Sequence, residues 1–333
     1  MRTFNLLRLA PALLLTISAF GQSTSQSMPQ TAKAPTDVKP SSITNDDLPY
    51  PHKVSYLPLT LYGQDVRMAY MDVAPTGTPN GRTVVLLHGF NFGGFYFEGP
   101  IEALRKEGFR VVVPDQIGFG RSSKPTIPYN FNDMARNTRV LLETLGISKA
   151  AIVGHSMGGM LTARFSASYP DIVERAVICN PIGLTDGRWQ RPWRTADEAY
   201  KATMAQNNDQ NWAGFSGTIH RYFQGNAWKP EYDKFIRIMY APSLSADWPR
   251  YAMARAILQQ MLLQDPVVYD WPHIKARTLV IGGANDYPEY PAQSRHAAET
   301  IPHGELVLIP DVGHVPHIQV PEIFERELLK FLK

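Results

Sequence analysis

The stretch that decides the fold reads AAIVGHSMGG and covers residues 150–159. It begins with a short apolar run, and residues 157–168 have the composition of a helix. Between the run and the helix lies the pattern Gly-x-Ser-x-Gly, with its serine at Ser156. The pattern is weak by itself, but between a strand and a helix it is typical of a nucleophile elbow, a turn so tight that its flanking positions must lack bulk. Ser156 is therefore the candidate nucleophile.

Short apolar runs alternate with helix-length segments on both sides of this elbow. Unbroken apolar strands separated by helices predict a doubly wound, mostly parallel α/β sheet that is covered on both faces. Two earlier runs, 54–61 and 66–73, alternate apolar with polar residues around Gly63 and predict an antiparallel hairpin. The predicted strands of the main sheet are 83–87, 111–113, 150–153, 176–178, 279–281 and 306–309, and the predicted helices are 101–107, 132–145, 157–168, 292–300 and 321–332.

The strand pattern stops after Pro181 and resumes at Thr278, an interval too long for an ordinary connection. Residues 182–272 are therefore predicted to form a helical cap, inserted into an α/β core made of 48–181 and 273–333. The cap holds all six tryptophans of the chain. Most of its aromatic side chains are expected to hold the cap together, and the others to line an apolar pocket between cap and core.

A serine hydroxyl is a poor nucleophile near neutral pH, so Ser156 needs a base that is oriented by an acid. Asp286 follows the apolar run that ends at Ile281, and His314 follows the run that ends at Ile309. Both are therefore expected in loops at the carboxyl edge of the sheet, and the order serine, acid, histidine is the order this kind of elbow predicts. The weaker candidates are His155, His303 and His317 for the base, and Asp186 and Asp311 for the acid.

An oxyanion that forms on a substrate carbonyl needs a pair of amide donors. The main-chain N–H of Met157, directly after the nucleophile, is expected to be the first. The N–H of Phe90 is expected to be the second, because it lies in the glycine-containing loop 88–94 after the strand 83–87. His88 in the same loop is expected to brace it through hydrogen bonds and to transfer no proton.

The N-terminus has the three parts of a secretory signal peptide. Arg2 and Arg8 flank a short start, residues 9–17 are largely apolar, and small residues precede position 22. The apolar run is shorter than the roughly 20 residues that a spanning helix needs. Residues 1–21 are therefore expected to be cleaved during export to the periplasm or the cell exterior, which leaves no stable membrane anchor.

Composition narrows the class of protein further. With 333 residues, 44% hydrophobic and 19% charged, the chain is globular, while the polar segment 22–47 is expected to be a flexible linker. The formal net charge is +3 and no run of Lys or Arg forms a basic stripe, so a nucleic-acid partner is not expected. No His or Cys cluster has metal-ligand spacing, and the single cysteine, Cys179, lies in an apolar run and is expected to be buried.

Together these motifs resemble the capped, single-chain α/β-hydrolases, a family that includes esterases, carbon–carbon bond hydrolases and aminopeptidases. The resemblance implies a serine hydrolase that acts on a small-molecule substrate through an acyl-enzyme and needs no cofactor or metal. It also implies structural roles for Asp115 and Ser122. The blocks that carry the resemblance are His88-Gly89-Phe90, residues 114–122, the elbow, Asp286, and Gly313-His314.

The same resemblance narrows the reaction. Haloalkane dehalogenases and epoxide hydrolases carry aspartate at the elbow, where this chain has Ser156, and proline aminopeptidases have a His-Gly-Gly-Pro-Gly loop, where this chain has Phe90 and Asn91. Hydrolysis of a small to medium, moderately apolar carboxylic ester is therefore the first expectation. The alternatives are a carbon–carbon hydrolase of a ring-fission diketone, a lactonase, an aminopeptidase, and a non-catalytic binding protein of the same fold.

Overall fold

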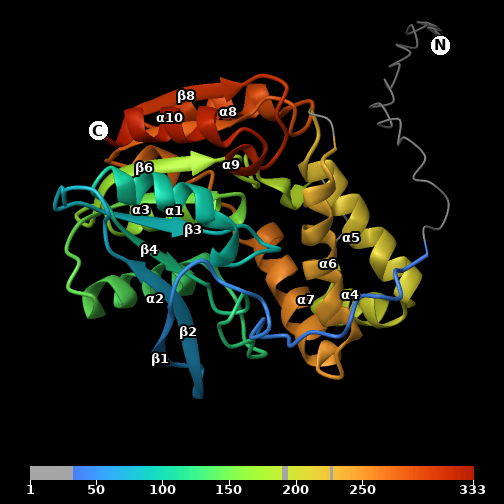
Figure 1. Ribbon diagram of the computed structural model, residues 1–333. Helices are drawn as coiled ribbons and strands as arrows, with labels where there is room; N and C mark the ends of the chain where they lie inside the picture. The colour runs from blue at the N-terminus through green and yellow to red at the C-terminus, as the bar shows by residue number, and fades with distance from the viewer. Residues whose placement is uncertain (1–32, 190–193, 226–227) are drawn as a thin grey trace, which may run out of the picture.

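The computed structural model describes residues 33–189, 194–225 and 228–333, so the expected signal peptide, 1–21, lies outside the described residues. An eight-stranded sheet in the order β1-β2-β4-β3-β5-β6-β7-β8 forms its centre (Figure 1). β1, β2 and β4 pair antiparallel and all other neighbours pair parallel, which confirms the predicted sheet and hairpin. The strands are β1 (Val54–Leu61), β2 (Gln64–Val73), β3 (Thr83–Leu87), β4 (Arg110–Pro114), β5 (Ala150–His155), β6 (Val173–Cys179), β7 (Arg277–Gly283) and β8 (Gly304–Ile309).

Helices cover both faces of the sheet, which explains why the strands are apolar without interruption. In β3, Val85 and Leu87 pack into one buried cluster with α2, α3 and α8, whereas Val84 and Leu86 pack into a second cluster with α1 and α10. Successive side chains of a strand point to opposite faces, so a strand covered on both sides must be apolar at every position. These helices are α1 (Glu98–Lys106), α2 (Phe131–Thr144), α3 (Met157–Ser168), α8 (Tyr290–Thr300) and α10 (Pro321–Leu332), with the short α9 (Pro316–Gln319) before the last.

A helical cap is inserted between β6 and β7 and lies beside the sheet at the end where the strand arrows point (Figure 1). Two of its helices begin with capping boxes, Thr195 with Glu198 and Asn207 with Gln210, which satisfy main-chain N–H groups at the helix start. Trp271 differs from the expectation, since it packs into the core cluster that contains α3 and α8. The cap helices are α4 (Ala196–Met204), α5 (Asn208–Tyr222), α6 (Asp233–Tyr240) and α7 (Trp248–Gln264), and the short 3-10 helices of the chain are η1 (Gly94–Phe97), η2 (Gly187–Trp189), η3 (Pro230–Tyr232), η4 (Ala241–Leu244) and η5 (Trp271–His273).

Residues 33–47 lie along the cap, where a flexible linker over 22–47 is the expectation from sequence. Ile43 is only 2% exposed, and Asp37 forms an ion pair of 2.7 Å with Arg237 on α6. Figure 1 shows this segment crossing the cap helices before it reaches the core. The main-chain N–H groups of Ala34 and Ser41 also donate to Asp209 and to the Ala241 carbonyl, so 33–47 contacts the cap at several points, which differs from the expectation of a flexible linker.

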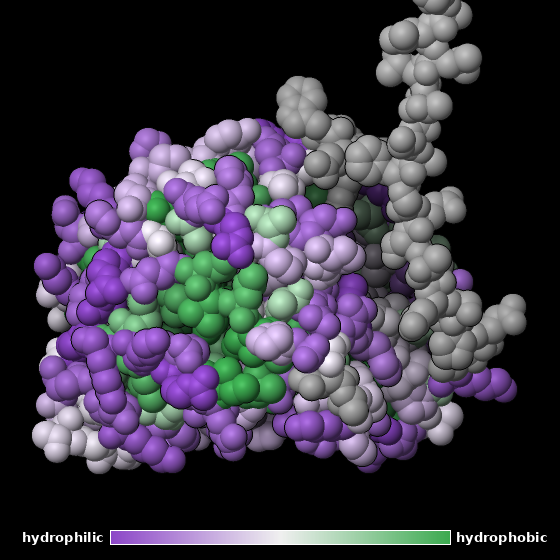
Figure 2. Space-filling model, turned by 90° about the horizontal axis from the view of Figure 1, so that it is seen from above, coloured by the Kyte–Doolittle hydropathy of each residue, from purple (hydrophilic) through white to green (hydrophobic). Residues whose placement is uncertain are grey.

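β8 forms one edge of the sheet, and its residues 306–308 are only half-buried. Figure 2 looks down on this side of the molecule and shows an apolar area surrounded by polar side chains. In the described ranges, no helix is both long enough and apolar enough to cross a membrane.

Candidate active site

Ser156 occupies a strained turn between β5 and α3. Its φ of 58° and ψ of −118° lie in a region that side chains other than glycine rarely adopt. A Cβ on Gly154 would overlap the carbonyl oxygen of Gly158, and a Cβ on Gly158 would overlap that of Leu87. The Ser156 N–H donates to the carbonyl of Cys179 at 2.9 Å. Close packing and this hydrogen bond hold Ser156 in place, as the predicted elbow requires.

His314 and Asp286 contact each other at the carboxyl ends of the adjacent strands β8 and β7. Nδ1 of His314 is 2.6 Å from Oδ2 of Asp286, and both side chains are 2% exposed. Since a carboxylate only accepts hydrogen bonds, Nδ1 carries the ring proton of neutral His314 and Nε2 is the acceptor. Nε2 is buried and has no hydrogen-bond partner among the described residues. The arrangement leaves one basic nitrogen available.

Asn180 is a further member of the site that the sequence pattern did not reveal. Its Nδ2 donates to Oδ2 of Asp286 at 2.9 Å, and its Oδ1 accepts the N–H of Gly283 at 3.0 Å. It directly follows β6, so it lies at the carboxyl edge of the strand beside β7. That position was the only signal in the sequence, and it gave no indication of which carboxylate the amide would hold.

The elbow and the His314 loop touch through His155. The rings of His155 and His314 are 4.9 Å apart, and Nε2 of His155 lies 2.7 Å from the carbonyl oxygen of His314. His155 thus supports the His314 loop from behind, whereas the sequence predicts only that it points away from the site. No hydrogen bond joins Ser156 to His314 in the described part of the chain. Such contacts are often long before a substrate binds.

Two main-chain N–H groups beside Ser156 are free to donate. Among the described residues, neither Met157 nor Phe90 donates its N–H to a protein acceptor. The loop of Phe90 closely approaches the elbow, because a Cβ on Gly89 would lie 3.2 Å from the Cβ of Ser156. The helix dipole of α3 adds partial positive charge at Met157. The region is therefore suited to negative charge on a substrate oxygen.

The loop after β3 is braced as predicted. Nδ1 of His88 donates to the Gly89 carbonyl at 2.8 Å, and its Nε2 accepts the N–H of Gln116 at 2.9 Å. Burial lowers the pKa of His88, which favours this neutral form. Tyr96 accepts the N–H of Gly89 at 2.8 Å from the other side. These bonds confirm that His88 holds the loop.

Asp115 and Ser122 also belong to the supporting structure. Asp115 accepts the hydroxyl of Tyr50 at 2.6 Å and the N–H groups of Gly94 and Arg121 at 2.6 and 2.7 Å. The hydroxyl of Ser122 donates to the carbonyl of Asp115 at 2.6 Å. Both side chains are buried and fully engaged in hydrogen bonds, so their observed contacts are structural.

The other weaker candidates for base and acid form no hydrogen bond with His314 or Asp286 among the described residues. His317 is buried, and burial lowers its pKa to about 3. Asp186 bonds to Arg188, and Asp311 is exposed in the turn after β8. Of the three proposed acids, only Asp286 contacts His314.

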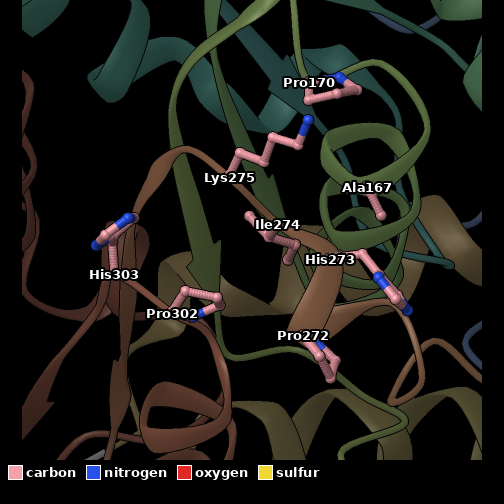
Figure 3. Close-up of a pocket in the computed structure, with 8 residues that line it drawn as sticks. All are labelled: Ala167, Pro170, Pro272, His273, Ile274, Lys275, Pro302 and His303. Atoms are coloured by element: carbon pink, nitrogen blue, oxygen red, sulfur yellow. The ribbon is translucent and has the colours of Figure 1, made fainter.

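His303, the remaining candidate for the base, lies at the end of the sheet opposite to Ser156, in a surface pocket of about 500 Å³ (Figure 3). Its lining residues end α3 or precede β7 and β8, at the amino ends of parallel strands, whereas Ser156 follows the carboxyl end of β5. In the described ranges, no three His, Cys, Asp or Glu side chains are grouped to hold a metal ion.

The cap reaches the site through Tyr222 and Arg255. The ring of Tyr222 is 4.5 Å from that of His314, and its carbonyl accepts the His314 N–H at 2.8 Å. Asn91 donates to the Tyr222 hydroxyl at 2.9 Å and accepts from the Arg255 guanidinium at 3.1 Å. Asn91 directly follows Phe90. Two cap helices, α5 through Tyr222 and α7 through Arg255, therefore hold the loop that carries the second free N–H. Nothing in the cap sequence marked these two residues.

The fold and this arrangement of residues define a hydrolase of the α/β type. The family model described as alpha/beta hydrolase fold matches residues 82–321, and the chain belongs to that family. A putative carbamate hydrolase of Caulobacter sp. (strain K31) is 27% identical over 79% of this chain and 95% of its own. Lipase 3 of Moraxella sp. (strain TA144) is 26% identical over 78% of this chain and 79% of its own.

Solved structures show the same relationship. A probable hydrolytic enzyme from Pseudomonas aeruginosa PAO1 is 35% identical, with a TM-score of 0.83 over 89% of this chain and 99% of that one. A thermophilic esterase from Thermogutta terrifontis is 26% identical, with a TM-score of 0.66 over 84% of this chain and 98% of that one. The named relatives support hydrolysis in general and differ in the bond that they cleave.

Proposed function

We propose that this chain is a serine hydrolase that cleaves a small to medium, moderately apolar carboxylic ester through an acyl-enzyme on Ser156. The observation that carries the proposal is the strained elbow, which holds Ser156 at the start of α3. The next residue is Met157, whose main-chain N–H donates to no protein acceptor among the described residues. Strain of this kind persists only where the surroundings impose it, and it concentrates at functional sites. The lipase and esterase relatives support an ester as substrate.

In the first half of the reaction, Nε2 of His314 accepts the Ser156 proton while Oγ attacks the ester carbonyl. The negative charge moves to the carbonyl oxygen, which accepts hydrogen bonds from the N–H groups of Phe90 and Met157. His314 then gives its proton to the leaving alcohol, and the acyl group stays on Oγ. Asp286 keeps the ring in the required orientation and stabilises its cationic form.

In the second half, His314 takes a proton from a water molecule, whose oxygen attacks the acyl carbonyl. Collapse of this intermediate returns the proton to Oγ of Ser156 and releases the carboxylic acid. The overall reaction consumes one water molecule for each ester that is cleaved, and it leaves the serine and the histidine in their starting states. A lactone is a cyclic ester and follows the same steps, and a structural relative 25% identical to this chain is described as degrading N-acyl homoserine lactones.

The test combines intact-mass spectrometry after fluorophosphonate treatment with turnover of p-nitrophenyl esters of increasing acyl length. We expect one adduct that is lost in Ser156→Ala, and turnover that peaks at an intermediate chain length. An adduct without ester turnover would move the substrate to a diketone, a lactone or a peptide. No adduct would favour the non-catalytic binding protein. A Ser156→Ala protein that hydrolyses as well as the parent would show that Ser156 is not the nucleophile.

We also propose that residues 1–21 direct export and are then removed, so that the enzyme acts in the periplasm or outside the cell. The charged start, short apolar run and small residues before position 22 support this. Cell fractionation followed by N-terminal sequencing tests it: a mature chain that begins near position 22 in the exported fraction is expected. Full-length chain retained in the cytoplasm would contradict it.

A further inference from the structure

A cap arginine lies close to the loop that carries the proposed oxyanion donor. Arg255 is on α7, and its guanidinium lies 5.3 Å from the ring centre of Phe90 and 5.6 Å from that of Tyr251. One of its nitrogens donates to Asn91 at 3.1 Å. Contact with two aromatic rings and one amide fixes the position of the planar group. The charge is therefore held beside the loop that carries Phe90 and Asn91.

Arg255 is half-buried, yet no Asp or Glu lies within 4.0 Å of its guanidinium in the described part of the chain. The residues outside that part contain neither Asp nor Glu, so none of them supplies a partner. Six of the other half-buried arginines that the structure describes have carboxylate partners: Arg82 with Glu174, Arg105 with Glu102, Arg110 with Asp72, Arg164 with Asp265 and Asp270, Arg188 with Asp186, and Arg237 with Asp37. The two exceptions are Arg121, which donates to three main-chain carbonyls, and Arg175, which lies at the amino end of β6, away from Ser156.

The acidic side chain of the proposed site cannot compensate this charge. Asp286 is bound to His314 and Asn180 and is 2% exposed. A guanidinium has five N–H donors, and Asn91 accepts from only one nitrogen of Arg255. Its other nitrogens have no acceptor among the described residues. The remaining donors form a fork that matches a carboxylate.

We propose that Arg255 binds a carboxylate of the substrate, so that the natural ester carries a second, ionised acid group at the far end of its acyl chain. This inference rests on the proposed ester hydrolysis at Ser156 and names its substrate class, the half-esters of dicarboxylic acids. The ring of Phe90 lies beside the guanidinium, so we expect the chain between ester and carboxylate to be apolar, and its length is the variable that the experiment scans. Arg255 thereby selects the substrate and takes no part in proton transfer.

The experiment compares matched esters on the full chain. The p-nitrophenyl half-esters of adipic, pimelic and suberic acid are measured beside the p-nitrophenyl esters of the monocarboxylic acids of equal length. The readout is the preference, defined as the ratio of kcat/KM for the half-ester to that for the neutral ester. We expect the parent to prefer the half-ester, and Arg255→Gln to lower this preference about 10- to 100-fold, the effect of losing a charge-assisted hydrogen-bonded pair.

Arg250→Gln is the matched control, because Arg250 is exposed on the first turn of the same helix and the variant changes the net charge equally. Its preference should equal that of the parent. Arg255→Glu provides a second readout, since it should shift the preference toward the ω-amino ester of the same length. A structural contact alone would not produce that reversal.

Three outcomes would overturn the inference. One is a parent enzyme that shows no preference for half-esters of any length. Another is an Arg255→Gln protein that loses both activities in equal proportion, which would make Arg255 a structural contact of the cap. The third is an unchanged preference in that variant. A parent enzyme that binds fluorophosphonate at Ser156 but cleaves none of these esters would instead remove the proposed ester hydrolysis, and the two failures are thus distinguishable.

Discussion

Nδ1 of His314 lies 2.6 Å from Oδ2 of Asp286, although 28 residues separate them in the chain. β7 and β8 are adjacent and parallel, so the loops after them emerge side by side. Asn180, from the loop after β6, donates to the same carboxylate oxygen at 2.9 Å. Loops from three neighbouring strands thus fix the orientation of one imidazole.

Asp286→Asn should lower kcat about 10³- to 10⁴-fold on any ester that the parent cleaves. An amide can present its NH2 to Nδ1, which would then accept and leave the proton on Nε2, where it cannot act as a base. Steady-state kinetics on a p-nitrophenyl ester measure the loss. Asp311→Asn is the control, since Asp311 is exposed in the turn after β8 and should give parental rates. An Asp286→Asn protein with nearly parental kcat would disprove the orienting role.

Asn91→Leu should lower kcat for a neutral ester about 10-fold with little change in KM, because it breaks the hydrogen bonds that tie the Phe90 loop to Tyr222 and Arg255. Asn91→Asp should retain most of the activity, since a carboxylate accepts from both the Tyr222 hydroxyl and the guanidinium. The rate of fluorophosphonate labelling should follow the same order. Equal losses in the two variants would count against this positioning role.

Gly154→Ala should destabilise the fold by about 3 kcal/mol or more, because the new methyl group meets the Gly158 carbonyl and the main chain must shift. Urea unfolding followed by circular dichroism measures the change. Gly214→Ala, in the middle of α5 with open space around its Cα, is the control and should raise the free energy of unfolding by up to about 1 kcal/mol. A Gly154→Ala protein as stable as the parent would show that the elbow has another geometry.

Stability should fall as the pH drops from about 6.5 toward 3, in part through His317. Its pKa in the folded chain is lowered to about 3 by burial, while an unfolded histidine titrates near 6.5, so the unfolded state binds more protons over this window. The free energy of unfolding should therefore decrease by about 2 kcal/mol for this group between pH 6.5 and 5. Urea unfolding at a series of pH values measures this slope.

His317→Phe should flatten that slope, since a phenyl ring fills the same site between Tyr96 and Phe324 without titrating. His303→Gln is the control, because His303 is exposed and its replacement should leave the slope as it is. An unchanged slope in His317→Phe would assign the acid sensitivity to other groups, of which buried His155, with its pKa well below the usual value, is the first candidate.

The sequence alone predicted the sheet, the elbow, and the loops that carry Asp286 and His314. These features depend on local patterns: apolar periodicity defines strands and helices, glycines mark the tight turn, and the order of residues along parallel strands places their loops at one edge. The interval after Pro181 likewise predicted an inserted cap, because no ordinary connection is so long. Each of these inferences needs only residues that are close in the chain.

Only the tertiary structure revealed what Asn180, Tyr222 and Arg255 contact, and that Asp37 pairs with Arg237 on the cap. Asn91 and Tyr222 are 131 residues apart, and Asn91 and Arg255 are 164 apart, so no periodicity links them. A polar side chain on a cap helix has the same sequence appearance whether it faces water or the site. Its role follows from how the cap packs against the core, and that packing depends on side chains contributed by distant parts of the chain.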